Sequence, residues 1–74
     1  MGTAEWPTKL EFFMKSRHIK AIDLTRRSGY SRQHILRVCM GRMDPTQRCI
    51  RAITEACRYL ANEKVSAMEL FELG

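Results

Sequence analysis

With 74 residues, the chain is long enough for one small domain, near the lower limit at which a hydrophobic core holds a fold unaided. Its 45% hydrophobic and 28% charged residues are typical of a folded protein, which excludes a mainly disordered chain. No apolar run approaches the roughly 20 residues that span a bilayer, and the MGTAEWP start is not typical of a signal peptide. We therefore expect a cytoplasmic protein with no membrane partner.

The positive charge is concentrated in the middle of the sequence. The net charge is +5, but residues 15–51 hold ten Lys and Arg residues against two Asp residues, a local net charge of +8. The flanking segments are slightly acidic, with −1 over residues 1–14 and −2 over residues 52–74. Such a one-sided excess favours a polyanionic partner, and a merely solvated basic face is the alternative.

A flexible arm is expected over residues 1–7, where periodicity is weak, followed by one domain over residues 8–74. Because the sequence carries no strand signal, we expect this domain to be all-α and compact. Its five helices are predicted at residues 8–17, 21–28, 31–40, 45–61 and 67–73.

Capping residues determine these predicted helix starts. The pairs that fit a capping box are Thr8 with Glu11, Asp44 with Gln47, and Ser66 with Glu69. Pro45 fits the first helical position after Asp44, because its missing N–H costs nothing there. Ser31 is expected to cap the third helix, and Gly41 to end it in a left-handed conformation.

Each predicted helix carries an apolar stripe, and together the stripes make one small core. Its expected members are Leu10, Phe13, Met14, Ile19, Leu24, Ile35, Val38, Ile50, Ile53, Cys57, Leu60, Val65, Leu70 and Phe71. The apolar residues left outside it are Phe12, Ile22, Leu36, Met40 and Leu73. Either these are simply exposed, as a short chain allows, or several of them form a partner surface.

Residues 21–41 are typical of two short helices around a glycine turn, a helix-turn-helix. Leu24, Ile35 and Val38 are spaced so that the two helices can pack, and Gly29 lies where the chain must reverse. Three side chains on the second helix point away from that core: Arg32, Gln33 and Arg37. Because Arg recognises guanine and Gln recognises adenine in the major groove, they are the predicted base-reading residues.

Over residues 10–57 the chain resembles the lambdoid phage repressor and Cro family of helix-turn-helix regulators, the xenobiotic-response-element type. The residues that carry the resemblance are Leu10, Phe13, Ile19, Leu24, Gly29, Ser31, Ile35, Val38, Gly41, Pro45, Ile50 and Ile53. The resemblance implies a lambda-repressor-like five-helix domain whose third helix enters the major groove of double-stranded DNA. It also implies a transcriptional regulator, expected to be a repressor, encoded by a bacterium or phage and associated with the nucleoid.

The resemblance matches Arg32, Gln33 and Arg37 to base-reading positions. Contacts with the DNA backbone are expected from Lys20, Arg26, Arg27, Ser31, His34 and Arg42. Two positions depart from the family: Ala21 stands where a phosphate-binding Gln is frequent, and Thr25 replaces a small residue at the helix crossing. The Thr25 hydroxyl must fit a tight contact there or bond back to a carbonyl.

A homodimer is expected, because a monomer of this size touches few base pairs and discriminates poorly among genomic sites. The predicted interface is Met68, Leu70, Phe71 and Leu73, in a tail that is short for burying all of them in its own core. Two-fold symmetry implies a pseudo-palindromic operator with half-sites about 34–36 Å apart.

Metal, cofactor and catalytic sites are not predicted. Cys39, Cys49 and Cys57 lack the paired spacing of zinc ligands, and Cys57 lies on an apolar stripe, so structural thiols are favoured over redox sensing or zinc binding. His18 is expected to be solvated. No glycine-rich phosphate loop, activated nucleophile or inward carboxylate pair indicates an enzyme, and no small-molecule pocket is expected.

An alternative class of function is a protein-binding module. An antitoxin-like subunit would neutralise a partner protein through its apolar surface and bind DNA only secondarily. RNA binding ranks below both, since the sequence offers no aromatic platform for stacking single-stranded bases.

Overall fold

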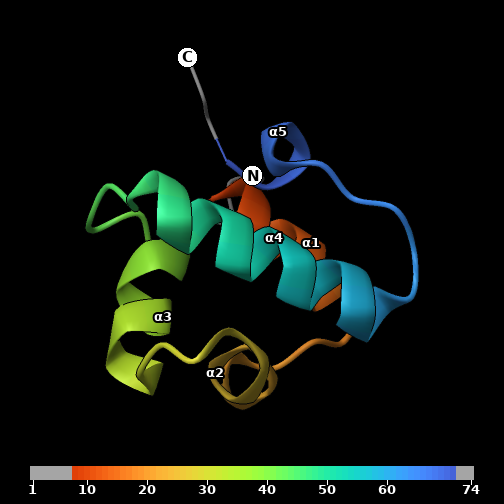
Figure 1. Cartoon of the computed structure of the whole chain (residues 1–74), viewed down its shortest axis with the longest axis horizontal. Coiled ribbons are helices and arrows are strands. Elements are labelled where there is room, and N and C mark those ends of the chain that lie inside the picture. Colours follow the sequence, from red (N-terminus) through yellow and green to blue (C-terminus); the bar gives the residue numbers. More distant parts are fainter. Residues whose placement is uncertain (1–7, 72–74) are drawn as a thin grey trace, which may run out of the picture.

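The computed structural model describes residues 8–71, and in this part of the chain all regular structure is helical. The helices are α1 (Lys9–Ser16), α2 (Ala21–Ser28), α3 (Arg32–Cys39), α4 (Gln47–Ala61) and α5 (Ala67–Leu70). The longest helix, α4, runs through the middle of the molecule, with α2 and α3 on one side of it and α5 near α1 (Figure 1). The predicted all-α, five-helix architecture is confirmed. The arm expected over residues 1–7 lies outside the described residues.

The predicted caps of α1 and α3 are confirmed. The Thr8 hydroxyl accepts from the Glu11 N–H at 3.1 Å and donates to the Cys39 carbonyl at 2.7 Å, so the start of α1 is bonded to the end of α3. The Ser31 hydroxyl accepts from the His34 N–H at 3.1 Å. The bonds from the Glu11 and His34 N–H groups each satisfy a backbone donor that would otherwise lack a partner in the first turn.

Two predicted boundaries are wrong. Helix α4 begins at Gln47, not at residue 45, because the Thr46 hydroxyl accepts from the Cys49 N–H at 3.1 Å and takes the capping role assigned to Asp44. Helix α5 begins as expected, with the Ser66 N–H bonded to Glu69 Oε2 at 3.2 Å, but ends at Leu70. Phe71 is extended, so the predicted helix does not continue through residue 71.

Left-handed residues follow α2, α3 and α4 and make the turn after α1. Gly29 (φ 86°) and Gly41 (φ 73°) follow α2 and α3 as predicted, and glycine adopts this conformation without a Cβ clash. A Cβ at Gly41 would also meet Thr8 Cγ2 at 3.2 Å. Asn62 (φ 56°) ends α4, and His18 (φ 58°) makes the turn after α1; neither was anticipated.

The core is built from side chains of all five helices and of the segments that join them. Its buried hydrophobic residues are Leu10, Phe13, Met14, Ile19, Leu24, Ile35, Val38, Cys39, Cys49, Ile53, Ala56, Cys57, Val65, Leu70 and Phe71. Ile50 and Leu60 are half-buried beside it. Phe12, Ile22, Leu36 and Met40 are exposed as predicted, Tyr59 and Met68 join them, and Leu73 lies outside the described residues.

Thr25 makes no bond back to a carbonyl: its hydroxyl oxygen is buried without a hydrogen-bond partner among residues 8–71.

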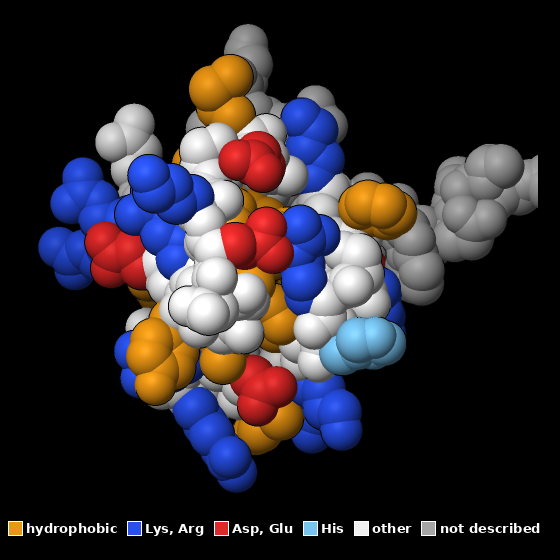
Figure 2. All heavy atoms as spheres, turned by 90° about the vertical axis from the view of Figure 1, so that its right-hand side faces the viewer, with side chains coloured by type: hydrophobic (Ala, Val, Ile, Leu, Met, Phe, Trp, Pro, Cys, Tyr) orange, Lys and Arg blue, Asp and Glu red, His pale blue; other side chains and the backbone are white. Residues whose placement is uncertain are grey.

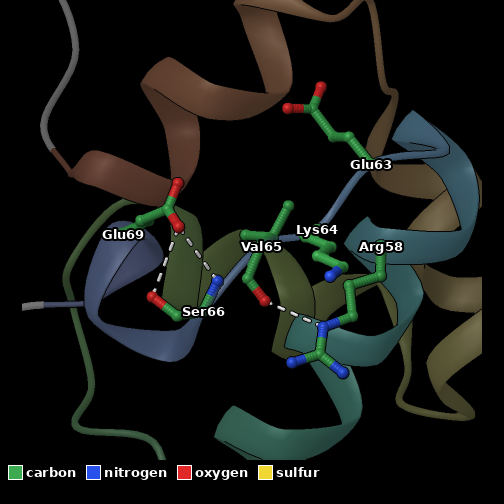
Figure 3. A pocket seen from close by; sticks show the side chains of 6 residues that line it. All are labelled: Arg58, Glu63, Lys64, Val65, Ser66 and Glu69. Carbon is green, nitrogen blue, oxygen red and sulfur yellow. Dashed lines mark hydrogen bonds between the residues drawn. The ribbon is translucent and has the colours of Figure 1, made fainter.

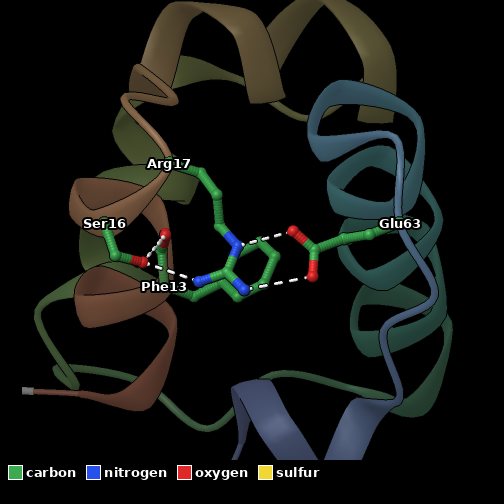
Figure 4. A network of polar contacts seen from close by, with 4 residues as sticks. All are labelled: Phe13, Ser16, Arg17 and Glu63. Atoms are coloured by element: carbon green, nitrogen blue, oxygen red, sulfur yellow. Dashed lines mark hydrogen bonds and ion pairs between the residues drawn. The ribbon is translucent and has the colours of Figure 1, made fainter.

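An arginine clamp joins the end of α1 to the segment after α4 (Figure 4). Arg17 Nε donates to Glu63 Oε2 at 2.8 Å and Arg17 Nη2 to Glu63 Oε1 at 3.0 Å, a bidentate pair. Arg17 Nη1 donates to Ser16 Oγ at 2.8 Å, and its guanidinium lies 4.2 Å above the Phe13 ring centroid. The hydrogen bonds from Arg17 lower the pKa of Glu63 below its ordinary value of 4.5.

We expect Glu63→Gln to lower the free energy of unfolding at pH 7 and to lose this effect in acid. A lowered carboxyl pKa in the folded state means that the ionised form stabilises the fold. That contribution is complete above the unfolded value of 4.5 and disappears as the pH falls through the folded value. Urea unfolding from pH 7 to pH 3 measures it, and a difference between wild type and variant that stays constant over this range would contradict the clamp.

Glu55→Gln is the matched control for this experiment. Glu55 is exposed on α4 and makes no hydrogen bond or ion pair with residues 8–71. Its replacement should therefore leave the pH dependence of unfolding close to that of wild type.

Candidate nucleic-acid interface

Helices α2 and α3 form a helix-turn-helix unit on one side of α4 (Figure 1). They pack against each other and are joined by the left-handed turn at Gly29. Leu24 on α2 and Ile35 on α3 are fully buried, as their predicted spacing requires, and Val38 is buried one turn further along. The burial of one face of α3 leaves its opposite face in solvent.

The exposed face of α3 consists of two parallel rows. Arg32, Leu36 and Met40 follow one another at intervals of four residues, and Gln33 and Arg37 form the neighbouring row. All five side chains are exposed. The structure therefore brings the three predicted base-reading residues together on a single surface.

Four arginines of this region make no polar side-chain contact within the part of the chain that the structure describes. Arg26, Arg32, Arg37 and Arg42 make no side-chain hydrogen bond or ion pair with any residue from 8 to 71. Helix α3 itself contains no acidic residue. The face of the molecule turned away from α3, in contrast, carries Asp and Glu side chains among the basic ones (Figure 2). The basic charge around α3 is thus available to an external polyanion.

Lys20 and Arg27, both expected at the DNA backbone, differ in their surroundings. Lys20 is exposed directly before α2, where its N–H donates to Asp23 Oδ2 at 3.2 Å. The Arg27 guanidinium lies 3.6 Å above the ring centroid of Tyr59 on α4, a cation–π contact. Arg27 remains exposed, but its direction is set by an aromatic residue that the sequence analysis did not single out.

His34 contacts two residues whose part in the site the sequence does not indicate. Its ring stacks on Tyr30 with centroids 4.7 Å apart, and its Nε2 lies 3.5 Å from Cys49 Sγ on α4. The side chain is half-buried, whereas Gln33 and Arg37 are exposed. This geometry orients α3 relative to α4.

The predicted dimer interface is only partly accessible in the described chain. Leu70 and Phe71 are buried in the domain's own core, because Phe71 leaves the helix in an extended conformation and its ring packs inward. Met68 is 70% exposed. Leu73 lies outside the described residues. The expectation that this tail cannot bury its apolar residues therefore fails for Leu70 and Phe71.

A surface pocket of about 370 Å³ between the end of α4 and α5 contains polar groups that are bonded to one another (Figure 3). Arg58 Nε donates to the Val65 carbonyl at 2.8 Å, and Ser66 Oγ lies 3.3 Å from Glu69 Oε2. It lies away from α3, and no predicted site residue lines it.

The three cysteines are buried and free, which confirms the predicted core position of Cys57. Burial raises the pKa of the Cys39 and Cys57 thiols to about 12, and the Glu11 carboxylate adds to the rise at Cys39. Burial also raises the pKa of Cys49.

Residues 8–71 contain no cluster of three potential metal ligands, and no helix among them has the length and apolarity needed to cross a membrane. His18 is exposed, as expected.

Comparison of the chain with protein-family models, with curated proteins and with solved structures gives no significant match.

We expect the three thiols to resist alkylation in the folded protein. The thiolate is the reactive form, and burial both raises the thiol pKa and blocks access. Iodoacetamide treatment at pH 8, followed by mass spectrometry, should give modification no faster than the protein unfolds, with complete labelling in urea as the control. Rapid labelling of Cys39 or Cys57 in the native protein would contradict the burial.

Proposed function

We propose that the protein is a sequence-specific DNA-binding transcriptional regulator, acting as a repressor, that inserts α3 into the major groove. The observation that supports it best is the exposed face of α3, where Arg32, Gln33 and Arg37 lie together without partners among the described residues. The major groove is wide enough for a helix, and it presents acceptor pairs to Arg and a donor–acceptor pair to Gln. The resemblance to the lambdoid repressor and Cro family supports the same assignment.

In this proposal the two kinds of polar contact have different effects. Arg32, Gln33 and Arg37 supply base discrimination. Contacts with phosphates come from Lys20, Arg26, Arg27, Ser31, His34 and Arg42, and they add affinity that depends on salt but not on sequence. The half-buried stacked position of His34 limits it to a phosphate near the start of α3.

The protein-binding module remains the second candidate, because large apolar side chains are exposed outside α3. Phe12 on α1, Tyr59 on α4 and Met68 on α5 are more than half exposed. An antitoxin-like protein would use such residues to hold its partner. Reduced DNA selectivity combined with tight capture of one protein encoded beside this chain would favour it.

We also propose that the regulator is a homodimer with its recognition helices one DNA turn apart. Met68 is the accessible apolar residue of the predicted interface, and Phe12 on the neighbouring α1 is exposed as well. A Lys9 Nζ bond to the Met68 carbonyl, at 3.3 Å, connects the two helices on this side. The cytoplasm of a bacterium is the location in which such a regulator would meet its operator.

Selection of bound sequences from a random duplex library, followed by arginine substitution, tests the DNA-binding proposal. Arg32→Ala and Arg37→Ala should each lose about 1–3 kcal/mol of discrimination between the selected duplex and random DNA. Arg42→Ala should weaken binding to the selected duplex and to random DNA equally. It should also reduce the slope of log affinity against log salt by about one. Lys64→Ala, an exposed cation between α4 and α5, is the control. Full discrimination by both recognition-helix variants would refute the assignment.

Met68→Asp tests the dimer more sharply than removal of the tail, because truncation would also take Leu70 and Phe71 out of the core. The variant should fold normally but sediment as a monomer, and it should prefer a full palindrome over one half-site much less than wild type. Phe12→Asp should act in the same direction. A wild-type protein that is monomeric at tens of micromolar and binds a half-site as tightly as the palindrome would contradict the dimer.

A further inference from the structure

Leu36 lies in the middle of the exposed face of α3. It is one turn after Arg32 and one turn before Met40, with Gln33 three residues earlier and Arg37 directly after it. Its side chain is 43% exposed, and the core contacts of α3 are made by other residues. The burial of the protein's own core therefore gives no reason for an apolar side chain here.

The position of Leu36 means that it accompanies its polar neighbours wherever they bind. Arg32 and Gln33 are in the first turn of α3 and Arg37 is in the second. If these side chains reach base edges, Leu36 is held between them and faces the floor of the same groove. An apolar group placed against polar base edges removes water from donors and acceptors without replacing its hydrogen bonds, which is unfavourable. The one apolar feature that the major groove offers is the C5-methyl group of thymine.

We propose that Leu36 is a specificity-determining residue that packs against a thymine methyl group in each half-site. The proposal rests on the proposed function, since it assumes that α3 lies in the major groove. The thymine belongs to a base pair next to those read by the arginines, because Leu36 is a helical neighbour of both. Leu36 thus adds an apolar contact to the operator preference, and the contribution of this contact does not depend on salt.

A docking surface for another protein is the competing role for Leu36. Its surroundings on the helix favour DNA, because two arginines without partners in residues 8–71 flank it and α3 has no acidic residue. A protein partner would have to neutralise or desolvate both guanidinium groups to bury one leucine. On DNA, the same groups find base edges and phosphates while the leucine finds a methyl group.

The test replaces single thymines of the selected duplex by deoxyuridine, which removes the methyl group and leaves base pairing intact. At one thymine per half-site, wild type should lose about fourfold in affinity per methyl group removed. Leu36→Ala should bind the original duplex at least as weakly as wild type binds the uracil duplex. The variant should then be insensitive to uracil at that position, which shows that side chain and methyl group interact. The substitution is at an exposed helical site and introduces the best helix former, so the fold is kept.

Ile22→Ala is the matched control, because it also shortens an exposed apolar side chain but lies on α2 and belongs neither to the proposed DNA contacts nor to the proposed dimer interface. It should keep the full sensitivity to uracil. Suppose that a duplex is selected, but no replacement of thymine by uracil lowers the affinity of wild type, or Leu36→Ala remains sensitive to uracil. The methyl contact is then refuted, while base reading by the arginines stands. If Leu36→Ala lowers the affinity for the thymine duplex and for the uracil duplex by the same factor relative to wild type, the methyl contact is also refuted. That result favours another role for the leucine. If no sequence is preferred over random DNA, the proposed function fails and the methyl contact fails with it.

Discussion

The rotation of α3 about its own axis is the constraint on which the candidate interface depends, and contacts on three sides fix it. Its apolar face packs on α2, where Ile35 is fully buried. At its end, the Cys39 carbonyl accepts from the Thr8 hydroxyl and Cys39 Sγ lies 3.5 Å from Met14 Sδ on α1. Near its start, His34 meets Cys49 of α4. A helix held by three neighbours presents one defined face, and binding then costs little conformational entropy.

Charge is arranged so that the structural ion pair and the candidate interface do not compete. Arg17 is used to join α1 to the segment after α4, where Glu63 supplies both carboxylate oxygens. The arginines of α3 and the turns beside it have no such carboxylate among residues 8–71. A cluster of unpaired cations destabilises a small domain by mutual repulsion, and binding of a polyanion relieves that repulsion. The energetic cost carried by the free protein is therefore consistent with a function in DNA binding.

Local chemistry made most of the fold predictable. The hydroxyl caps at Thr8 and Ser31 and the glycines after α2 and α3 act within a few residues, so the sequence around them contains the whole signal. The exposed apolar residues followed for a similar reason, since the helical period determines which side of a helix faces the core. Thr46 was missed because two capping residues stand two positions apart, and propensity alone does not choose between them.

Contacts between distant segments were the part that sequence could not supply. Nothing in the spacing of Arg27 and Tyr59, or of His34 and Cys49, indicates that each pair meets, because the meeting depends on how α2 and α3 lie on α4. The burial of Phe71 likewise depends on tertiary packing around α5, where the residue is extended, rather than on helix propensity. As a result, periodicity predicted which residues lie on the exposed face of α3, but not which residues orient that face.

The cysteines act as structural residues in this orientation. Cys39 and Cys49 are each 1% exposed, and they touch Met14 and His34 through sulfur atoms. Sulfur is small enough to let helices approach closely and polarisable enough to make favourable contacts with a thioether or an imidazole. Because these contacts lie on the core side of α3, a change of side-chain volume at Cys39 or Cys49 would change the tilt of α3 without altering any residue on its exposed face. The direction in which the exposed face of α3 points is thus coupled to the packing of buried residues that do not belong to that face.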